Sequence, residues 1–196
     1  MRLRTLPLSL AGVALGVCLA ASKFRVSPWT AVLVFLTTVC LQILSNLSNE
    51  LGDALNGTDT DERQGPQYAL GSGEMSVKDI KILIGIFVGL CIVSGLAMIQ
   101  VSFGDIFKTE SICLEVLGAA AIVGAMKYTL GKNPYGYRGL GDVFVFIFFG
   151  LVSVLGGYYV AARELPSLIM LLPASAIGCF SVGVLNVNNI RDMKTD

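Results

Sequence analysis

The amino-acid sequence predicts an all-α, polytopic membrane protein built as a bundle of transmembrane helices. The 196 residues are 54% hydrophobic and only 14% charged. An ordinary globular domain carries roughly 25% charged residues, because its surface faces water. The apolar residues also form six long stretches, and a helix of about 20 apolar residues crosses the hydrocarbon layer of a bilayer. Both observations favour a chain that is surrounded largely by lipid.

Six membrane spans are expected along residues 1–196, which we interpret as a single membrane-embedded domain. Five are free of charge: Thr5 to Ser22, Val26 to Asn49, Ile82 to Gly104, Val143 to Ala162 and Leu165 to Ile190. The fourth in order, Thr109 to Gly131, contains Glu115 and Lys127 near its ends, where long side chains can reach the interface. Arg2 and Arg4 before the first apolar run also resemble the start of a signal peptide. The five apolar segments that follow favour a first membrane helix instead.

The charged residues gather on one side of the expected membrane. Successive spans place their flanking charges on alternate sides of the membrane. The side that holds the loops after the second, fourth and sixth spans, and the residues before the first span, carries ten basic and ten acidic residues, and the other side carries four of each. Basic residues favour the cytoplasmic side, so we expect the crowded loops to be cytoplasmic and the protein to lie in the cell (inner) membrane. The zero net charge argues against a nucleic-acid partner. The absence of histidine excludes a histidine general base and His-ligated zinc or haem.

Two motifs of asparagine and aspartate close the second and sixth spans. Asn49 and Asp53 are four residues apart, so one helix face carries both, and Asp59 follows after a turn. The same spacing recurs at the end of the sixth span in Asn188, Asp192 and Asp196. Oxygen ligands suit Mg²⁺, which proteins commonly hold by one or two carboxylates together with the phosphates of a substrate. A single motif is more often a solvated helix end, but two on one side of the membrane predict a site for a metal-bound diphosphate.

The loop between the fourth and fifth spans combines cations with aromatic rings. Residues 127–142 contain Lys127, Lys132 and Arg138, together with Tyr128, Tyr135 and Tyr137. Cations can bind phosphate oxygens, and aromatic faces can stabilise a nearby positive charge. A positively charged loop with interfacial tyrosines is the alternative interpretation.

At these residues the sequence resembles the UbiA superfamily of intramembrane prenyltransferases. Within it, the sequence is most similar to the branch that acts on 1,4-dihydroxy-2-naphthoate in menaquinone synthesis. The resemblance covers nearly the whole chain and rests on Arg4-Thr-Leu-Pro-Leu-Ser9, the paired Asn-x-x-x-Asp motifs and Pro134-Tyr-Gly-Tyr-Arg-Gly-Leu-Gly-Asp142.

The resemblance implies a Mg²⁺-dependent enzyme whose partners are the lipid bilayer, a polyprenyl diphosphate and an aromatic acid. The metal ligands implied are Asp53, Asp59, Asp192 and Asp196. The substrate-binding residues implied are Asn49, Asn188, Tyr137, Arg138 and Arg191, and the catalytic ones are Tyr128, Lys132 and Arg63. In the family scheme pyrophosphate departs, an allylic carbocation forms, and the electron-rich ring attacks it with loss of carbon dioxide to give a demethylmenaquinone.

Family members usually have nine transmembrane helices, so the resemblance also predicts that this chain lacks the last helices. Two other functions stay open. One is prenyl transfer to another aromatic acceptor, such as 4-hydroxybenzoate, which the identity of the quinone product would distinguish. The other is a non-enzymatic six-helix transporter or channel with Asp and Asn clusters at a pore mouth. That function predicts ion flux without release of diphosphate.

Overall fold

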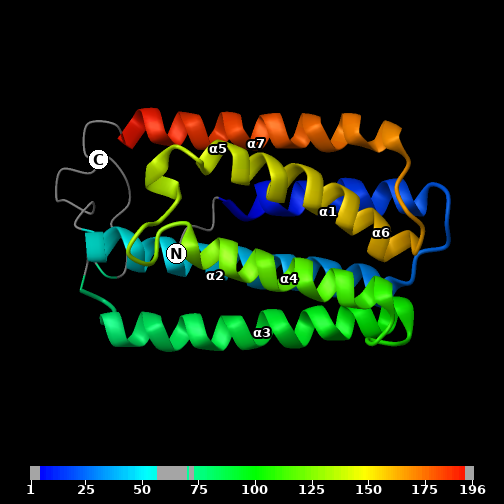
Figure 1. The fold of residues 1–196 in the computed structure, drawn as a ribbon, viewed down its shortest axis with the longest axis horizontal. Coiled ribbons are helices and arrows are strands. Elements are labelled where there is room, and N and C mark those ends of the chain that lie inside the picture. Colours follow the sequence, from blue (N-terminus) through cyan, green and yellow to red (C-terminus); the bar gives the residue numbers. More distant parts are fainter. Residues whose placement is uncertain (1–4, 57–69, 71–72, 193–196) are drawn as a thin grey trace.

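The computed structural model describes residues 5–56, 70 and 73–192. Every regular element in this part of the chain is a helix, as the sequence predicts, and the helices run side by side along the long axis of the molecule (Figure 1). Five segments are long and apolar enough to cross a membrane: Pro28–Asn56 (α2), Val77–Phe103 (α3), Thr109–Lys127 (α4), Gly141–Ala162 (α5, η3 and α6) and Leu168–Ile190 (η4 and most of α7). The prediction of a polytopic helical bundle is confirmed.

The first apolar segment forms a helix that is shorter than the others. Helix α1, Leu6–Ala21, has 16 residues, or about 24 Å at 1.5 Å per residue. Pro7 lies in its first turn, where the missing amide hydrogen has no helical partner. Gly12 and Gly16 let this helix approach the fifth span closely, since a Cβ at Gly16 would lie 2.3 Å from the carbonyl oxygen of Val154.

Helix α2 continues beyond the charge-free stretch of the second span. The charge-free stretch stops at Asn49, but the helix runs on through Glu50 to Asn56. Asn49 and Asp53 therefore lie on regular helix, on one face. Helix α3 begins at a capping box, in which Ser76 and Asp79 bond each other's backbone amides, and Gly104 ends it in the left-handed conformation.

The fifth span changes its helix type in the middle. It begins as α5, Gly141–Val145, continues as a π-helix, η3, from Phe146–Gly156, and returns to an α-helix in α6, Gly157–Ala162. Such π-helical segments are rare and often mark functional sites. The loop before it contains a short 3₁₀ helix, η2, Gly136–Arg138. The sixth span joins a 3₁₀ turn, η4, Leu168–Met170, to α7, Leu171–Asp192.

Buried apolar side chains form two separate clusters, and α2 contributes to both. One joins α1, α2 and α6 through residues that include Val13, Val17, Val34, Tyr158 and Val160. The other joins α2 to α3 through Cys40, Leu44, Leu47, Leu51, Ile80, Ile84 and Cys91. Many other large apolar side chains face outward, Leu168 and Phe180 among them. An outward apolar surface fits a chain whose solvent is lipid.

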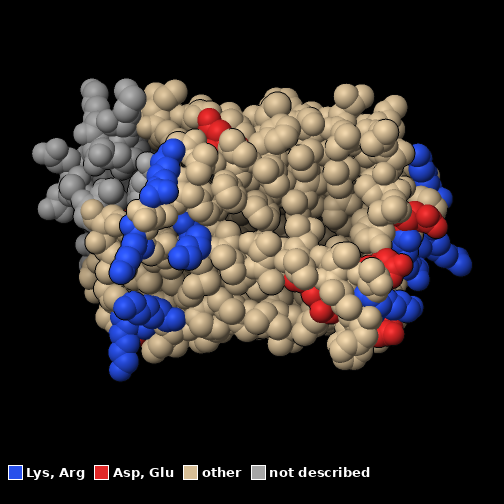
Figure 2. Space-filling view, viewed as in Figure 1, with Lys and Arg blue, Asp and Glu red and all other residues tan. Residues whose placement is uncertain are grey.

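The charged side chains lie mainly at the two ends of the bundle. Figure 2 shows Lys, Arg, Asp and Glu at both ends, with a broad, almost uncharged band between them. We call the end at which α2, α4 and α7 finish and α3 and α5 begin the site end. The basic residues of this end whose side chains are described are Lys78, Lys81, Lys127, Lys132 and Arg138.

Candidate functional site

A large cavity lies inside the bundle. Its volume is about 1010 Å³, and its wall contains residues of α1, α2, α3, α4, α5, η3 and α7 and of the loop after α4. Ligand pockets commonly measure about 300–1,000 Å³. The space is therefore sufficient for a substrate of considerable size.

Helix α2 lines this cavity along most of its length. We call its cavity-facing residues the α2 stripe: Val34, Thr37, Thr38, Leu41, Gln42, Ser45, Asn46, Asn49 and Asp53. The stripe extends over 19 residue steps, or about 28 Å along the helix axis. It is aliphatic at Val34, neutral and polar in the middle, and acidic at Asp53. The cavity thus has a polar end near Asp53 and a mainly apolar end near Val34, although Glu115 of α4 also belongs to the wall.

The polar end collects four of the residues singled out from the sequence. Asn49 and Asp53 of α2, Tyr128 after α4 and Asn188 of α7 all line the same cavity. Asp53 is only 8% exposed. Asn49 and Asn188 are 139 positions apart in the sequence, so their presence in the wall of one cavity depends on the packing of the whole bundle.

Thr129 fixes the chain after α4 against α2. Its Oγ1 donates a hydrogen bond to the carbonyl oxygen of Ser48 (2.8 Å) and also lies 3.2 Å from Oδ1 of Asn49. Nδ2 of Asn56 donates to the carbonyl oxygens of Gly52 (2.9 Å) and Thr129 (3.4 Å). These contacts hold Tyr128 beside the Asn49 turn of α2.

A row of aromatic rings forms the wall beside this polar end. We call Tyr128, Tyr135, Phe144 and Phe148 the aromatic wall, and all four line the cavity. Tyr135 meets Tyr128 edge to face, with centroids 5.3 Å apart, and stacks on Phe144 at 4.0 Å. The Tyr135 hydroxyl donates to the carbonyl oxygen of Gly124 (2.6 Å). Burial, and secondarily the neighbouring Tyr128, raises the pKa of Tyr135 to about 12, so this phenol stays neutral at physiological pH.

A neutral polar network joins α1 to the middle of the α2 stripe. Ser9 donates a hydrogen bond to Oε1 of Gln42. Nε2 of Gln42 donates to Thr5 Oγ1 (3.0 Å) and to Asn46 Oδ1 (3.1 Å). All four residues line the cavity. Gln42 is not among the predicted site residues, although an amide within an apolar span is costly unless it has partners and therefore indicates a buried contact.

Other predicted site residues lie away from the cavity or beyond the described part of the chain. Lys132 and Arg138 are exposed in the loop after α4 and are not part of the cavity wall. Glu50, which lies between Asn49 and Asp53 in the sequence, is buried, and its Oε1 accepts a hydrogen bond from the backbone amide of Leu70 (3.2 Å). Asp59, Arg63 and Asp196 lie outside the described residues, as do the side chains of Tyr137, Arg191 and Asp192.

The polar end fits a hard divalent cation in the chemistry of its donors. Asp53 offers a carboxylate, and Asn49 and Asn188 offer amide oxygens, which are the ligand types that Mg²⁺ prefers. Among the described residues, no group of three or more His, Cys, Asp or Glu side chains gathers at one point. The predicted metal set therefore remains a prediction, because three of its four aspartates have side chains outside the described part.

Comparison with known proteins gives one consistent result. The UbiA prenyltransferase family matches residues 9–196. The chain is 41% identical to the 1,4-dihydroxy-2-naphthoate octaprenyltransferase of Escherichia coli (strain K12) over 197 residues, covering 100% of this chain and 63% of the relative. Proteins of the same name from Haemophilus influenzae (strain ATCC 51907 / DSM 11121 / KW20 / Rd) and Mycobacterium leprae (strain TN) are 40% and 39% identical over the same shares. The chain thus spans less than two thirds of the length of these relatives.

Proposed function

Since this chain belongs to the UbiA prenyltransferase family, we propose that it serves in Mg²⁺-dependent transfer of a polyprenyl group from a polyprenyl diphosphate to 1,4-dihydroxy-2-naphthoate. The products would be a demethylmenaquinone, carbon dioxide and diphosphate. The observation that carries the proposal is one cavity in which α2 and α7 bring Asn49, Asp53 and Asn188 to one end, while the other end is lined mainly by apolar residues, with Glu115 of α4 as a charged exception. An amphiphilic diphosphate has the same division into a charged head and an apolar tail.

The polar end would bind the diphosphate head of the donor. Asn49, Asp53 and Asn188, with the predicted aspartates Asp59, Asp192 and Asp196, would hold Mg²⁺. The ion, when bound, neutralises charge on the leaving diphosphate. Arg63, Lys132, Arg138 and Arg191 are proposed to add positive charge around the same head group, because guanidinium and ammonium groups bind phosphate oxygens well.

The aromatic wall would protect the reacting centre. Tyr128 lines the cavity together with Asn49 and Asp53, where positive charge develops on the prenyl group as diphosphate leaves. The faces of Tyr128, Tyr135 and Phe144 carry partial negative charge and stabilise a nearby cation. Their apolar edges also exclude water, which would otherwise capture the allylic cation.

The name of the relatives supports 1,4-dihydroxy-2-naphthoate as the acceptor.

We propose that the site end lies at the cytoplasmic face of the inner membrane, because it carries many basic residues. The prenyl tail would extend along the α2 stripe toward Val34, where most of the wall is apolar.

The decisive experiment is a product assay on the purified chain in lipid nanodiscs. The chain is incubated with octaprenyl diphosphate and 1,4-dihydroxy-2-naphthoate, with Mg²⁺ or with EDTA, and the products are identified by mass spectrometry. We expect a demethylmenaquinone and released diphosphate only when Mg²⁺ is present. A product formed with 4-hydroxybenzoate instead would assign a different acceptor. Ion flux across vesicles without diphosphate release would contradict enzymatic function altogether.

A further inference from the structure

Glu115 places a carboxyl group at membrane depth, and the proposed diphosphate site does not use it. The residue lies in the second turn of α4, is half-buried and lines the cavity. Its Oε1 atom is buried and has no hydrogen-bond partner among the described residues. A buried carboxylate is costly unless a cation or a hydrogen-bond donor meets it, and an ionisable residue within a membrane span commonly marks a ligand site. Glu115 therefore requires a partner that the described part of the chain does not supply.

Glu115 lies far from the polar end of the cavity. Helices α2 and α4 pack against each other, and both finish at the site end. Thr129, which bonds to the Asn49 turn of α2, follows Glu115 by 14 positions, or about 21 Å along a helix. A ligand held at Glu115 would therefore not contact the groups proposed to bind Mg²⁺.

Thr37 adds a second polar atom without a partner at a similar depth. It lines the same cavity, and its Oγ1 is buried with no hydrogen bond to any residue that the structure describes. Thr37 precedes Asn49 by 12 positions, or about 18 Å, so its depth agrees with that of Glu115 to about 3 Å. An ammonium group carries three N–H donors, which is enough to bind both oxygen atoms.

The wall around these two oxygen atoms is open and mainly apolar. A Cβ atom at Gly118, one turn after Glu115, or at Gly156 of η3 would meet nothing within 4 Å, and both glycines line the cavity. Met98 and Leu114 also line it, and they pack against the apolar cluster that α1, α2 and α6 share. This end of the cavity thus has space for an aliphatic chain beside the carboxyl group.

The charge of the cavity wall favours a cationic ligand. The acidic residues that line the cavity are Asp53, Asp142 and Glu115, and no described Lys or Arg lines it. Asp53 and Asp142 lie at the site end, near the end of α2 and the beginning of α5. Because water is scarce in an apolar cavity, a positive charge beside Glu115 would be attracted more strongly there than in solution.

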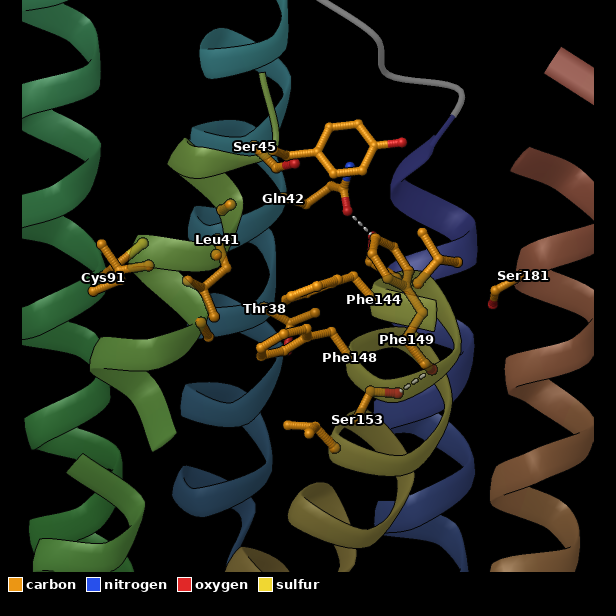
Figure 3. A pocket seen from close by; sticks show the side chains of 18 of the residues that line it. Thr38, Leu41, Gln42, Ser45, Cys91, Phe144, Phe148, Phe149, Ser153 and Ser181 are labelled. Atoms are coloured by element: carbon orange, nitrogen blue, oxygen red, sulfur yellow. Dashed lines mark hydrogen bonds between the residues drawn. The ribbon is translucent and has the colours of Figure 1, made fainter. Parts of the chain in front are cut away.

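Two aromatic rings near the depth of Thr37 also favour a cation. Figure 3 shows Phe144 and Phe148 extending from the fifth span toward Thr38, the next residue of α2. Both rings line the cavity. The faces of aromatic rings attract positive charge and also pack well against aliphatic groups.

We propose that Glu115 and Thr37 form a binding site for a lipophilic ammonium ion, an amine carried on an aliphatic chain. The ammonium group would pair with Glu115 and donate a hydrogen bond to Oγ1 of Thr37. The chain would lie against the mainly apolar wall between these residues and the rings of Phe144 and Phe148. Binding at this site requires neither the prenyl donor nor Mg²⁺.

The test is binding of radiolabelled dodecylamine to the chain in phosphatidylcholine nanodiscs, with empty nanodiscs to subtract partition into lipid. We expect saturable binding that 1-dodecanol, with the same chain and no charge, displaces poorly. Glu115→Gln should weaken binding about tenfold or more, and Thr37→Val about threefold. Matched controls are Glu110→Gln and Thr109→Val in the exposed first turn of α4, which should bind as the wild type does.

Glu115→Gln keeps the size of the side chain, and circular dichroism and thermal unfolding verify that its fold is retained. Glu115→Asp keeps the charge and should bind dodecylamine more tightly than Glu115→Gln does. Equal binding to the wild type and to Glu115→Gln would overturn the proposal. An equal loss in Glu110→Gln, or no saturable binding to the wild type, would overturn it as well.

The effect of the ligand on turnover rests on the proposed function. If the chain is active, dodecylamine should compete with octaprenyl diphosphate, because both would occupy the mainly apolar end of the cavity. Half-inhibition of Glu115→Gln should then require about tenfold more amine. Inhibition of equal strength in the two proteins would overturn the inference and leave the proposed function standing. Binding that depends on Glu115, without any prenyl transfer, would support the site and contradict the proposed function.

Discussion

Gly52 of α2 and Thr129 after α4 approach so closely that a Cβ atom at Gly52 would lie 2.4 Å from Cβ of Thr129. Both are buried, and both adjoin residues that line the cavity. The distance between the Asn49 turn and Tyr128 is therefore set by the absence of a side chain at position 52.

Gly52→Ala should separate α2 from the chain after α4. The added methyl group meets both the side chain and the backbone of Thr129, so we expect a loss of about 1–3 kcal/mol in stability. We also expect at least a tenfold loss of prenyl transfer, because displacement of about 1 Å disturbs a reactive geometry. Thermal unfolding and the product assay measure the two effects. Gly89→Ala is the control, since a Cβ there meets nothing within 4 Å; equal behaviour of the two variants would refute the argument.

Thr129→Val should weaken the contacts that position Asn49, while the new side chain keeps the size and shape of threonine. The variant loses the hydroxyl that donates to the Ser48 carbonyl and contacts Asn49, at a cost of about 1 kcal/mol. Because Asn49 is a proposed Mg²⁺ ligand, the Mg²⁺ concentration for half-maximal activity should rise several-fold. Thr129→Ser keeps the hydroxyl and should restore the wild-type requirement. If Thr129→Val needs the same Mg²⁺ concentration as the wild type, the proposal that Asn49 binds the metal is wrong.

Asp53→Asn should abolish most activity. The change removes a negative charge from the polar end but keeps the size of the side chain, so we expect kcat to fall about a hundredfold or more. The matched control is Asp105→Asn, an exposed aspartate in the loop between α3 and α4 at the opposite end of the bundle. Addition of EDTA to the wild type should produce a comparable loss. Near-normal turnover in Asp53→Asn would show that Asp53 is not a metal ligand.

Tyr135→Phe should change how stability depends on alkaline pH. The pKa of Tyr135 is about 12 in the folded protein, against 10.0 for a free phenol, so the folded state favours the protonated form. The contribution of this raised pKa to the free energy of unfolding is complete below pH 10 and is lost as the pH rises toward 12. The variant should lose less stability than the wild type between pH 10 and 12, when unfolding is measured at a series of pH values. Parallel curves for the two proteins would contradict this.

The positions of the helices could be predicted largely from the sequence, because lipid requires long apolar runs. The spacing of Asn49 and Asp53 also predicted helix as far as Asp53, which the structure has. The last helical residue, Asn56, could not be predicted, because a helix continues into polar surroundings as long as its residues favour it. The π-helical turns of η3 were also missed, since residues 146–156 have the composition of any apolar helix.

At the site, spacing alone indicated that Asn49 and Asp53 share a face, and the second motif indicated Asn188. The contacts of Gln42 depend on which helix lies beside α2, and a pattern within one segment does not contain that information. The same holds for Tyr135, whose ring stacks on Phe144 only because the loop after α4 turns back over the cavity.

Helix α2 belongs to both apolar clusters, and this has a consequence for the order of assembly. Leu44 and Ile84, in the cluster shared with α3, are 40 positions apart, so the pair can form early during synthesis. Val13 and Tyr158, in the other cluster, are 145 positions apart, and loop closure over such a separation is slow. We therefore expect α1 to pack against α2 first, with Ser9 bonded to Gln42, and to complete its cluster only after α6 has been inserted. In this order, the cavity is enclosed only after the helix pair that supplies its α2 wall has formed.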